Sequence, residues 1–213
     1  MGFSTAEALL RAGFNVTITA RSKEKGEEAI KSLSALGPVK YIIMDNNDLA
    51  SVASAASSLS EPALDVLVNN AGIMNTPFAL TKDGFEAQYQ VNHLSHFLLV
   101  HLLFPKLAAA QGGGRVVNLA SRAHMRHPGP IDYALLKSTN AQNYDGWQAY
   151  GRSKLSNILC AKAWAKRFPV QSSGIAFFSL HPGLVATDLQ SISIVIFSQR
   201  NRKENTTGRC FSY

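Results

Sequence analysis

The stretch LDVLVNNAG, residues 64–72, carries the pattern that decides the fold class. Its first part, 64–68, is short and mostly apolar, as in a strand buried within a parallel sheet. Two asparagines, an alanine and a glycine follow at once, at the strand end beyond which ligands bind in such sheets. Gly72 lets backbone approach a ligand closely, and the asparagine side chains can tie the turn to neighbouring strands; an ordinary turn is the alternative interpretation.

The segments on either side alternate between strand-like and helix-like patterns. This alternation predicts right-handed crossovers and a parallel sheet, and therefore an α/β fold. The polar and basic segment 191–213 fits no periodic pattern, although 192–197 could form a strand. Strands are expected at 15–20, 39–44, 64–68, 115–119 and 174–180, and helices at 3–12, 22–36, 48–59, 84–110 and 147–168.

Composition narrows the class of protein. The 213 residues suit one domain, 1–190, followed by a divergent basic tail, 191–213. An apolar content of 46% excludes a disordered polar chain. The net charge of +7 is scattered, without the basic stripe of a nucleic-acid surface. Two cysteines far apart favour a reducing compartment, and hence the cytoplasm, and exclude a metal cluster built on cysteines. No apolar run approaches the length of a membrane span.

Tyr150 and Lys154 stand four residues apart in Y-G-R-S-K, inside a predicted helix. This spacing places both side chains on one helix face. A free tyrosine has a pKa near 10, and a neighbouring ammonium favours the phenolate, so the pair can act as a general acid and base. Alone the pair is weak evidence, because this spacing is common in helices.

Two further polar residues support a site at the same edge of the sheet. Ser121 follows the strand predicted at 115–119, where its hydroxyl can donate to a developing oxyanion; a helix or turn cap is the alternative. Asn92 is a polar residue inside an otherwise apolar helix, and a buried amide must be paired.

These motifs together resemble the short-chain dehydrogenase/reductase family, and most closely its retinol-dehydrogenase-like branch. N-N-A-G at 69–72, V-N-H at 91–93, Ser121, Y-x-x-x-K at 150–154 and H-P-G at 181–183 occur in the family's order. The resemblance covers about residues 2–189. It implies a three-layer, Rossmann-like, doubly wound parallel sheet. It also implies an oxidoreductase that interconverts alcohol and carbonyl on a small apolar substrate, retinoid-like or lipid-derived.

The resemblance also assigns roles. Tyr150 matches the proton donor, Lys154 the residue that lowers its pKa and holds the nicotinamide ribose, and Ser121 the group that polarises the substrate oxygen. Asn92 matches the residue that holds a water in the proton relay. Asp45 matches the acid that contacts adenine, although Asn46 after it departs from the family's apolar residue. The remaining cofactor contacts fall on Gly2, Asn69, Ala71, Gly72, Pro182, Gly183 and Thr187.

The end of the second strand indicates which cofactor is used. A site that prefers NAD(H) places Asp or Glu there to bind the ribose hydroxyls, whereas an arginine accommodates the 2′-phosphate of NADP(H). The chain has Ala20, Arg21 and Ser22, without an acid. Arg21 can bind phosphate in a bidentate manner. NADP(H) is therefore expected, with NAD(H) as the less favoured alternative and a solvated arginine as the other interpretation.

The two ends of the chain depart from the family pattern. Of the family's opening strand and T-G-x-x-x-G-x-G turn, only the last glycine is matched, by Gly2. We therefore expect an incomplete sheet, with an unfilled or poorly bridged gap between strands 15–20 and 64–68. The chain is then expected neither to bind NADP(H) tightly nor to turn over.

Three hypotheses stay open: an NADP(H)-dependent oxidoreductase with an incomplete sequence, an inactive nucleotide-fold protein that binds a partner, and a non-functional fragment. The resemblance further implies a homodimer through helices 84–110 and 147–168. It also implies, for many relatives, an N-terminal membrane anchor that a truncation would remove.

Overall fold

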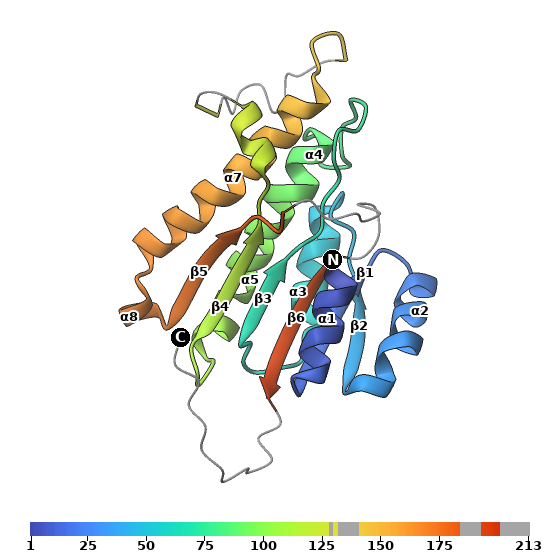
Figure 1. Cartoon of the computed structure of the whole chain (residues 1–213), viewed down its shortest axis with the longest axis vertical. Helices are drawn as coiled ribbons and strands as arrows, with labels where there is room; N and C mark the ends of the chain where they lie inside the picture. Colours follow the sequence, from blue (N-terminus) through green and yellow to red (C-terminus); the bar gives the residue numbers. More distant parts are fainter. Residues whose placement is uncertain (128–129, 132–140, 184–192, 201–213) are drawn as a thin grey trace.

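Five strand-like segments of the sequence form strands, and a sixth strand joins them in one sheet. The computed structural model describes residues 1–127, 130–131 and 141–183, and the backbone of 193–200. Within these residues the strand order is β2-β1-β6-β3-β4-β5 (Figure 1). The strands are β1 (Phe14–Ala20), β2 (Val39–Ile43), β3 (Val66–Asn69), β4 (Gly114–Leu119), β5 (Ile175–Leu180) and β6 (Ser193–Arg200).

The helices begin at the capping residues that the sequence indicates. The Ser22 side chain accepts a hydrogen bond from the Lys25 amide, and Asp48 accepts from the amides of Ala50 and Ser51, so the helices expected at 22–36 and 48–59 are capped at their first residues. Gly13 follows the first helix with a φ of +86°, a conformation that favours glycine. The helices include α1 (Gly2–Arg11), α2 (Lys23–Leu33), α3 (Leu49–Ser58), α5 (Ser95–Ala108), α7 (Gly146–Arg167) and α8 (Val170–Ser173), with 3₁₀ turns η1 (Ser34–Leu36) and η3 (Arg122–Arg126).

The helix predicted at 84–110 is shorter and less regular than expected. It begins as α4 (Ala87–Tyr89), passes through a π turn, η2 (Gln90–Leu94), and continues as α5. Gly84 has a φ of +79°, which a helix does not accommodate. The Glu86 carboxylate accepts hydrogen bonds from the first amides of α4 and so sets its start. The wider turn holds Asn92, one of the predicted site residues, and such turns are frequent at functional sites.

The predicted strand pairs are confirmed. β1 pairs with β2 in parallel, with Val16 opposite Val39. β3 pairs with β4, and β4 with β5, also in parallel. The carboxyl ends of these five strands therefore lie at one edge of the sheet, which is called the carboxyl edge below.

The prediction of a gap between β1 and β3 is wrong, because β6 lies between these two strands. β6 pairs antiparallel with β1, from Phe14 to Thr19, and antiparallel with β3, from Val66 to Val68. Two strands with unpaired amides and carbonyls would be costly, and β6 supplies pairing partners for both. The chain leaves β5 at the carboxyl edge and enters β6 from that same edge, so β6 runs opposite to the other strands (Figure 1). The sheet thus extends into the segment that the sequence sets apart as a tail.

Alternating side chains of the central strands supply a core on each face of the sheet. Leu67 and Val116 pack in one hydrophobic cluster with residues of α3 and α5. Their neighbours Val68 and Val117 pack in the other, with residues of α1 and α2. The helices therefore cover both faces, which gives the three layers expected of a doubly wound sheet.

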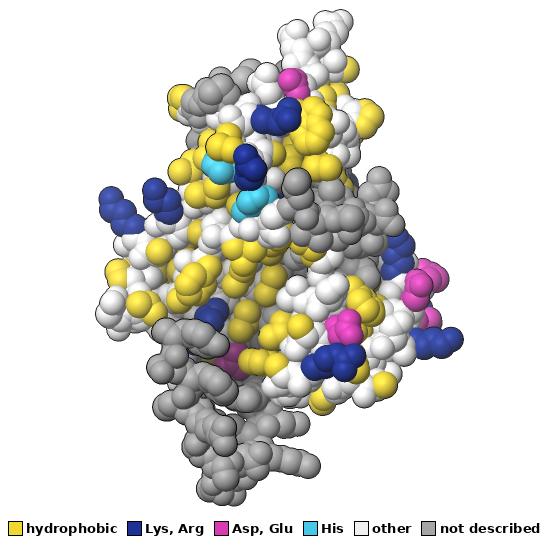
Figure 2. Space-filling model, in the orientation of Figure 1, with side chains coloured by type: hydrophobic (Ala, Val, Ile, Leu, Met, Phe, Trp, Pro, Cys, Tyr) yellow, Lys and Arg dark blue, Asp and Glu magenta, His cyan; other side chains and the backbone are white. Residues whose placement is uncertain are grey.

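One part of the sheet is less well covered. In Figure 2 apolar side chains lie in the open over β4 and β5, beside α1. Phe178 and Leu180 of β5 are 48% and 43% exposed. They alternate with Ile175 and Phe177, which pack in the cluster of α3 and α5 on the other face. The half of the sheet that ends in β5 thus leaves apolar surface open on the side of α1.

Candidate active site

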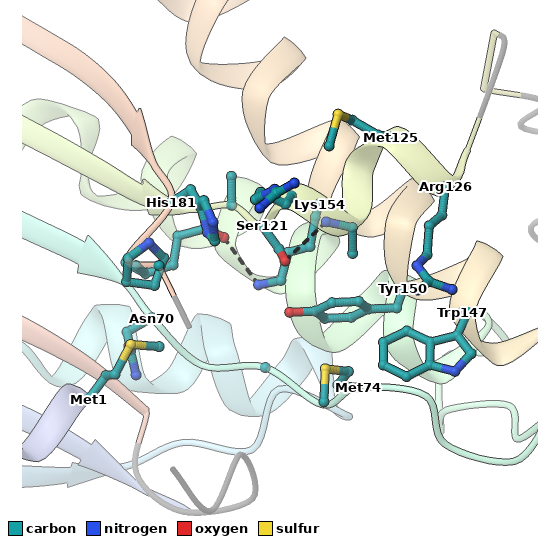
Figure 3. A pocket seen from close by; sticks show the side chains of 17 residues that line it. Met1, Asn70, Met74, Ser121, Met125, Arg126, Trp147, Tyr150, Lys154 and His181 are labelled. Atoms are coloured by element: carbon teal, nitrogen blue, oxygen red, sulfur yellow. Dashed lines mark hydrogen bonds between the residues drawn. The ribbon is translucent and has the colours of Figure 1, made fainter. Parts of the chain in front are cut away.

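A pocket opens at the carboxyl edge, where the turns after three strands meet the start of α7. Its volume is about 590 Å³. The turn after β3 contributes Asn70 and Gly72, the turn after β4 contributes Ser121, and the turn after β5 contributes Pro182 and Gly183. Tyr150 and Lys154 of α7 complete the set (Figure 3). The position of these residues agrees with the rule that ligands bind beyond the carboxyl ends of strands.

α7 places Tyr150 and Lys154 on its buried face, as their spacing predicts. Asp145 caps the helix by accepting hydrogen bonds from Trp147 and Gln148, which fixes its first turn. The exposed fraction is 5% for Tyr150 and 4% for Lys154. The Lys154 Nζ lies 5.6 Å from the centre of the Tyr150 ring. It donates a hydrogen bond to the Leu119 carbonyl, at the end of β4, over 3.1 Å.

Burial shapes the ionisation of both residues. It lowers the pKa of Lys154 to about 8, because loss of hydration disfavours the charged ammonium. It raises the pKa of Tyr150, and a hydrogen bond with Ser121 opposes the rise. The lowering of the Tyr150 pKa that the sequence suggested is therefore not found in this structure. The phenol holds its proton at neutral pH, as a proton donor must.

Ser121 satisfies both interpretations of its sequence position. Its side chain accepts a hydrogen bond from the Ala123 amide over 3.2 Å and so caps η3. The same hydroxyl is hydrogen-bonded to Tyr150. Two hydroxyls therefore meet in the pocket, one from the end of β4 and one from α7. Such a pair can hydrogen-bond to a single substrate oxygen.

Asn92 is fully buried, and its amide ties the site together. Its Oδ1 accepts from the Ile73 amide over 2.8 Å, and its Nδ2 donates to the Ile73 carbonyl and to the Ser153 hydroxyl, each over 2.9 Å. These bonds hold the segment that follows Gly72 against α7. The sequence indicated that a buried amide at Asn92 needs hydrogen-bond partners, and groups of the protein supply them.

Gly72 stands where a side chain would make a short contact with its neighbours. A β-carbon at this position would lie 3.1 Å from the Asn92 Oδ1 and 3.4 Å from the Lys154 Nζ. The glycine therefore leaves room beside two polar groups of the site, and the shape is that of a cradle for a ligand.

The other members of the N-N-A-G motif have different places. The Asn69 Nδ2 donates to the Asn118 Oδ1 over 2.7 Å, which joins the ends of β3 and β4. Ala71 is buried in the cluster of α3 and α5. Neither residue lines the pocket, whereas Asn70 and Gly72 do. The motif therefore divides into a structural half and a half that faces the pocket.

The predicted contacts with the adenine end of the cofactor lie outside the described pocket. Gly2 is buried at the start of α1, whose preceding residue, Met1, lines the pocket. Arg21 follows β1 and is exposed at the carboxyl edge. The Asp45 Oδ1 accepts hydrogen bonds from the backbone and side chain of Asn47. Thr187 lies outside the described residues.

Sequence reasoning missed Ser153 and Asn157, which support the site from α7. The Asn157 Nδ2 donates to the carbonyls of Asn92 and Leu119, each over 3.0 Å. Leu119 is the residue whose carbonyl also binds Lys154. The signal was present, because position 157 lies three residues after Lys154 and so shares its helix face.

One end of the pocket was also missed, because its residues carry no motif. Met74, Met125, Arg126 and Trp147 line the pocket together with Tyr150.

In the part of the chain that the structure describes, no helix combines the length and apolar character needed to cross a membrane. No cluster of three His, Cys, Asp or Glu side chains there is placed to hold a metal ion.

Comparison with known proteins points to the same family as the motifs. The family model described as short chain dehydrogenase matches residues 1–139. Retinol dehydrogenase 13 of Homo sapiens is 39% identical over 89% of this chain, and short-chain dehydrogenase/reductase drtF of Aspergillus calidoustus is 42% identical over 89%. The chain spans 57% and 65% of the lengths of these two relatives.

Solved structures agree. An uncharacterized protein from Mycobacterium Paratuberculosis superposes with a TM-score of 0.76 at 39% identity, covering 89% of this chain and 66% of that one. A Pseudomonas aeruginosa protein solved as the RhlG/NADP active-site complex gives 0.67 at 29% identity, covering 88% and 69%. The family model covers more than half of the sequence and the fold agrees, so this chain belongs to the short-chain dehydrogenase family.

Proposed function

We propose that this chain is the core of an NADP(H)-dependent oxidoreductase that interconverts an alcohol and a carbonyl on a small apolar substrate, retinoid-like or lipid-derived. The observation that carries the proposal is the meeting of the Ser121 and Tyr150 hydroxyls in one pocket, with Lys154 behind them. The names of the curated relatives, which include retinol dehydrogenases, support the substrate class.

Tyr150 is the proton donor in the reductive direction. Its raised pKa keeps the phenol protonated at neutral pH, so its proton can move to the carbonyl oxygen of the substrate. Ser121 donates a second hydrogen bond to that oxygen and stabilises the negative charge that develops on it. In the oxidative direction Ser121 holds the oxygen of the alcohol by a hydrogen bond, and the phenolate form of Tyr150 accepts its proton.

The residues of the nicotinamide side fit a dinucleotide. When bound, the nicotinamide supplies a hydride to the substrate carbon or accepts one from it. The cradle at Gly72 leaves space beside Lys154, whose ammonium can bind ribose hydroxyls. Asn92 holds the loop segment at this cradle in place through its bonds to Ile73. Pro182 and Gly183 line the pocket at the end of β5 and face the carboxamide in this proposal.

Arg21 carries the proposed preference for NADP(H). It stands at the carboxyl end of β1, where a 2′-phosphate is bound in such folds, and its sequence neighbours Ala20 and Ser22 are not acids. The sequence suggested weak cofactor binding because of a gap in the sheet, and β6 fills that gap. Titration of the full chain with NADPH and NADH, followed by cofactor fluorescence, therefore measures the preference without turnover. Arg21→Asp is expected to reverse or erase it, because a repulsive charge replaces a phosphate partner. Equal affinity of the parent chain for both cofactors would refute the assignment.

Site-directed variants test the chemistry. With NADPH and retinal, Tyr150→Phe is expected to lower kcat by roughly 10²–10⁴, the usual contribution of a general acid. Ser121→Ala is expected to lower it by roughly 10²–10³. Lys154→Met is compared with Lys162→Met, an exposed lysine of the same helix, and only the former is expected to lose activity. Full turnover by Tyr150→Phe would exclude the proposed proton donor.

The oligomeric state of the chain is also a proposal. We propose a homodimer through α5 and α7, where Phe97 and Leu159 are each 45% exposed. Light scattering of the parent chain and of Phe97→Glu tests it. A dimer that persists unchanged in the variant would place the interface elsewhere.

A further inference from the structure

The pocket has two ends of different chemistry. Met1 and Asn70 lie at one end, and Met125, Arg126 and Trp147 lie at the other, with Ser121 and Tyr150 between them (Figure 3). The first end adjoins α1 and the cradle at Gly72, where the cofactor is proposed to bind. The second end is therefore the side from which a substrate reaches the two hydroxyls.

Local packing brings Arg126 to this second end. Arg126 is the last residue of η3, which Ser121 caps and which packs against the first turns of α7. A β-carbon on Gly151 would lie 2.5 Å from the Ala123 carbonyl oxygen and 3.5 Å from the Arg126 β-carbon. The glycine beside Tyr150 thus allows η3 to sit directly on α7, which fixes Arg126 close to the catalytic tyrosine.

The guanidinium of Arg126 lies over an aromatic ring rather than against a carboxylate. It is 4.9 Å from the centre of the Trp147 ring, and that ring centre is 6.4 Å from the centre of the Tyr150 ring. Among the described residues, Arg126 takes part in no ion pair. The carboxylate of Asp145 at the start of α7 is occupied by the amides of Trp147 and Gln148.

The described pocket is lined by positive but not by negative side chains. Arg122, Arg126 and Lys154 line it, and its lining includes no aspartate or glutamate. An arginine stacked on an aromatic ring keeps its fork of donors free for a planar anion, which it can bind with two parallel hydrogen bonds. Met74, Met125 and the indole of Trp147 supply apolar surface between this cation and the reactive hydroxyls.

From this arrangement we propose that Arg126 binds an anionic group of the substrate. The substrate of the proposed oxidoreductase is then an apolar alcohol or carbonyl compound with a carboxylate or similar anion at its far end. The apolar body lies along Trp147 and the methionines, and the reacting carbon lies at Ser121 and Tyr150. This inference rests on the proposed function, because it takes the bound molecule to be the substrate of the oxidoreductase. The binding of the anion itself needs no turnover.

Fluorescence of Trp147 reports this binding directly. The chain contains two tryptophans, so Trp164→Phe leaves Trp147 as the single indole. In that background we titrate an ω-oxo fatty acid and its uncharged methyl ester, in the absence of cofactor. Wild-type Arg126 is expected to bind the acid about tenfold more tightly than the ester, a difference of about 1.4 kcal/mol.

Variants separate charge from packing. Arg126→Gln is expected to weaken binding of the acid to the level of the ester and to leave the ester unchanged, and Arg126→Lys is expected to retain part of the preference. Arg115→Gln, an exposed arginine at the opposite edge of the sheet, is expected to keep the full preference. Equal affinity of the parent for acid and ester, or an equal loss of both in Arg126→Gln, would overturn the inference.

The same pair of ligands distinguishes this inference from the proposed function. If NADPH reduces acid and ester with equal kcat/KM, the oxidoreductase proposal stands and the anion site is refuted. If the acid binds preferentially through Arg126 but neither ligand is reduced, the anion site stands and the oxidoreductase proposal fails. If both hold, Arg126→Gln raises KM for the acid about tenfold with little change in kcat, because in this proposal Arg126 binds the far end of the substrate and does not touch the reacting atoms.

Discussion

Replacing His96 with glutamine is expected to remove a large part of the acid sensitivity of this fold. His96 is 2% exposed in α5, its Nδ1 lies 2.9 Å from the Asn92 carbonyl, and its Nε2 has no hydrogen-bond partner among the described residues. Burial lowers its pKa to about 3, from 6.5. The folded state therefore keeps His96 neutral at a pH where the unfolded chain binds a proton.

The sign and the size follow from proton linkage. Because the folded pKa is depressed for a basic group, the stability is fully present above about pH 6.5 and is lost as the pH falls towards the folded pKa. Between about pH 7 and pH 5 the unfolded chain gains nearly one proton at this site and the folded chain gains none. At about 1.36 kcal/mol per pKa unit, the loss in unfolding free energy is about 2 kcal/mol.

Urea unfolding at the two pH values measures this loss. The wild-type loss is expected to exceed that of His96→Gln by about 2 kcal/mol, or roughly 1 M in the urea midpoint. Part of the acid sensitivity remains in the variant, because burial also lowers the pKa of His93 to about 4. His101→Gln, an exposed histidine of the same helix, is the control and is expected to behave as wild type. An equal loss in wild type and His96→Gln would refute the reasoning.

Three further predictions concern stability. Gly114→Ala is expected to destabilise the fold by more than about 1 kcal/mol, because its β-carbon would lie 2.5 Å from the Leu107 carbonyl oxygen, whereas Gly112→Ala has open space; similar melting temperatures of the two variants would contradict this. Asp48→Ala is expected to cost about 1 kcal/mol through loss of the α3 cap, and an unchanged urea midpoint would count against it. Deletion of 191–213 is expected to abolish cooperative unfolding, since β6 joins the two halves of the sheet; a sharp thermal transition in the shortened chain would disprove that role.

The sequence reveals most of the fold because its signals are local. Ser22 and Asp48 start helices through their own side chains, and the apolar run 64–68 is followed directly by the polar turn that lines the pocket. Tyr150, Lys154 and Ser121 could be placed together because the ends of parallel strands meet at one edge. These features depend on a few neighbouring residues or on the general geometry of a parallel sheet.

The parts that could not be predicted depend on contacts between distant segments. β6 forms because β1 and β3 both present open edges, and the run 192–197 shows only that a strand is feasible. The π turn around Asn92 depends on how α4 and α5 meet their neighbours. Arg126 and Trp147 belong to no motif and become a pair only when η3 packs against α7.

The position of β6 has a consequence for the biogenesis of this chain. β6 follows the other five strands in the sequence, yet it lies in the interior of the sheet. A ribosome completes β3 at Asn69 and reaches β6 only at Ser193, an interval on the order of ten seconds at roughly 5–20 residues per second. During that time the nascent chain carries two open strand edges, which are templates for pairing with other polypeptides. Its yield in a cell should therefore depend on how well chaperones shield those edges until the last strand emerges.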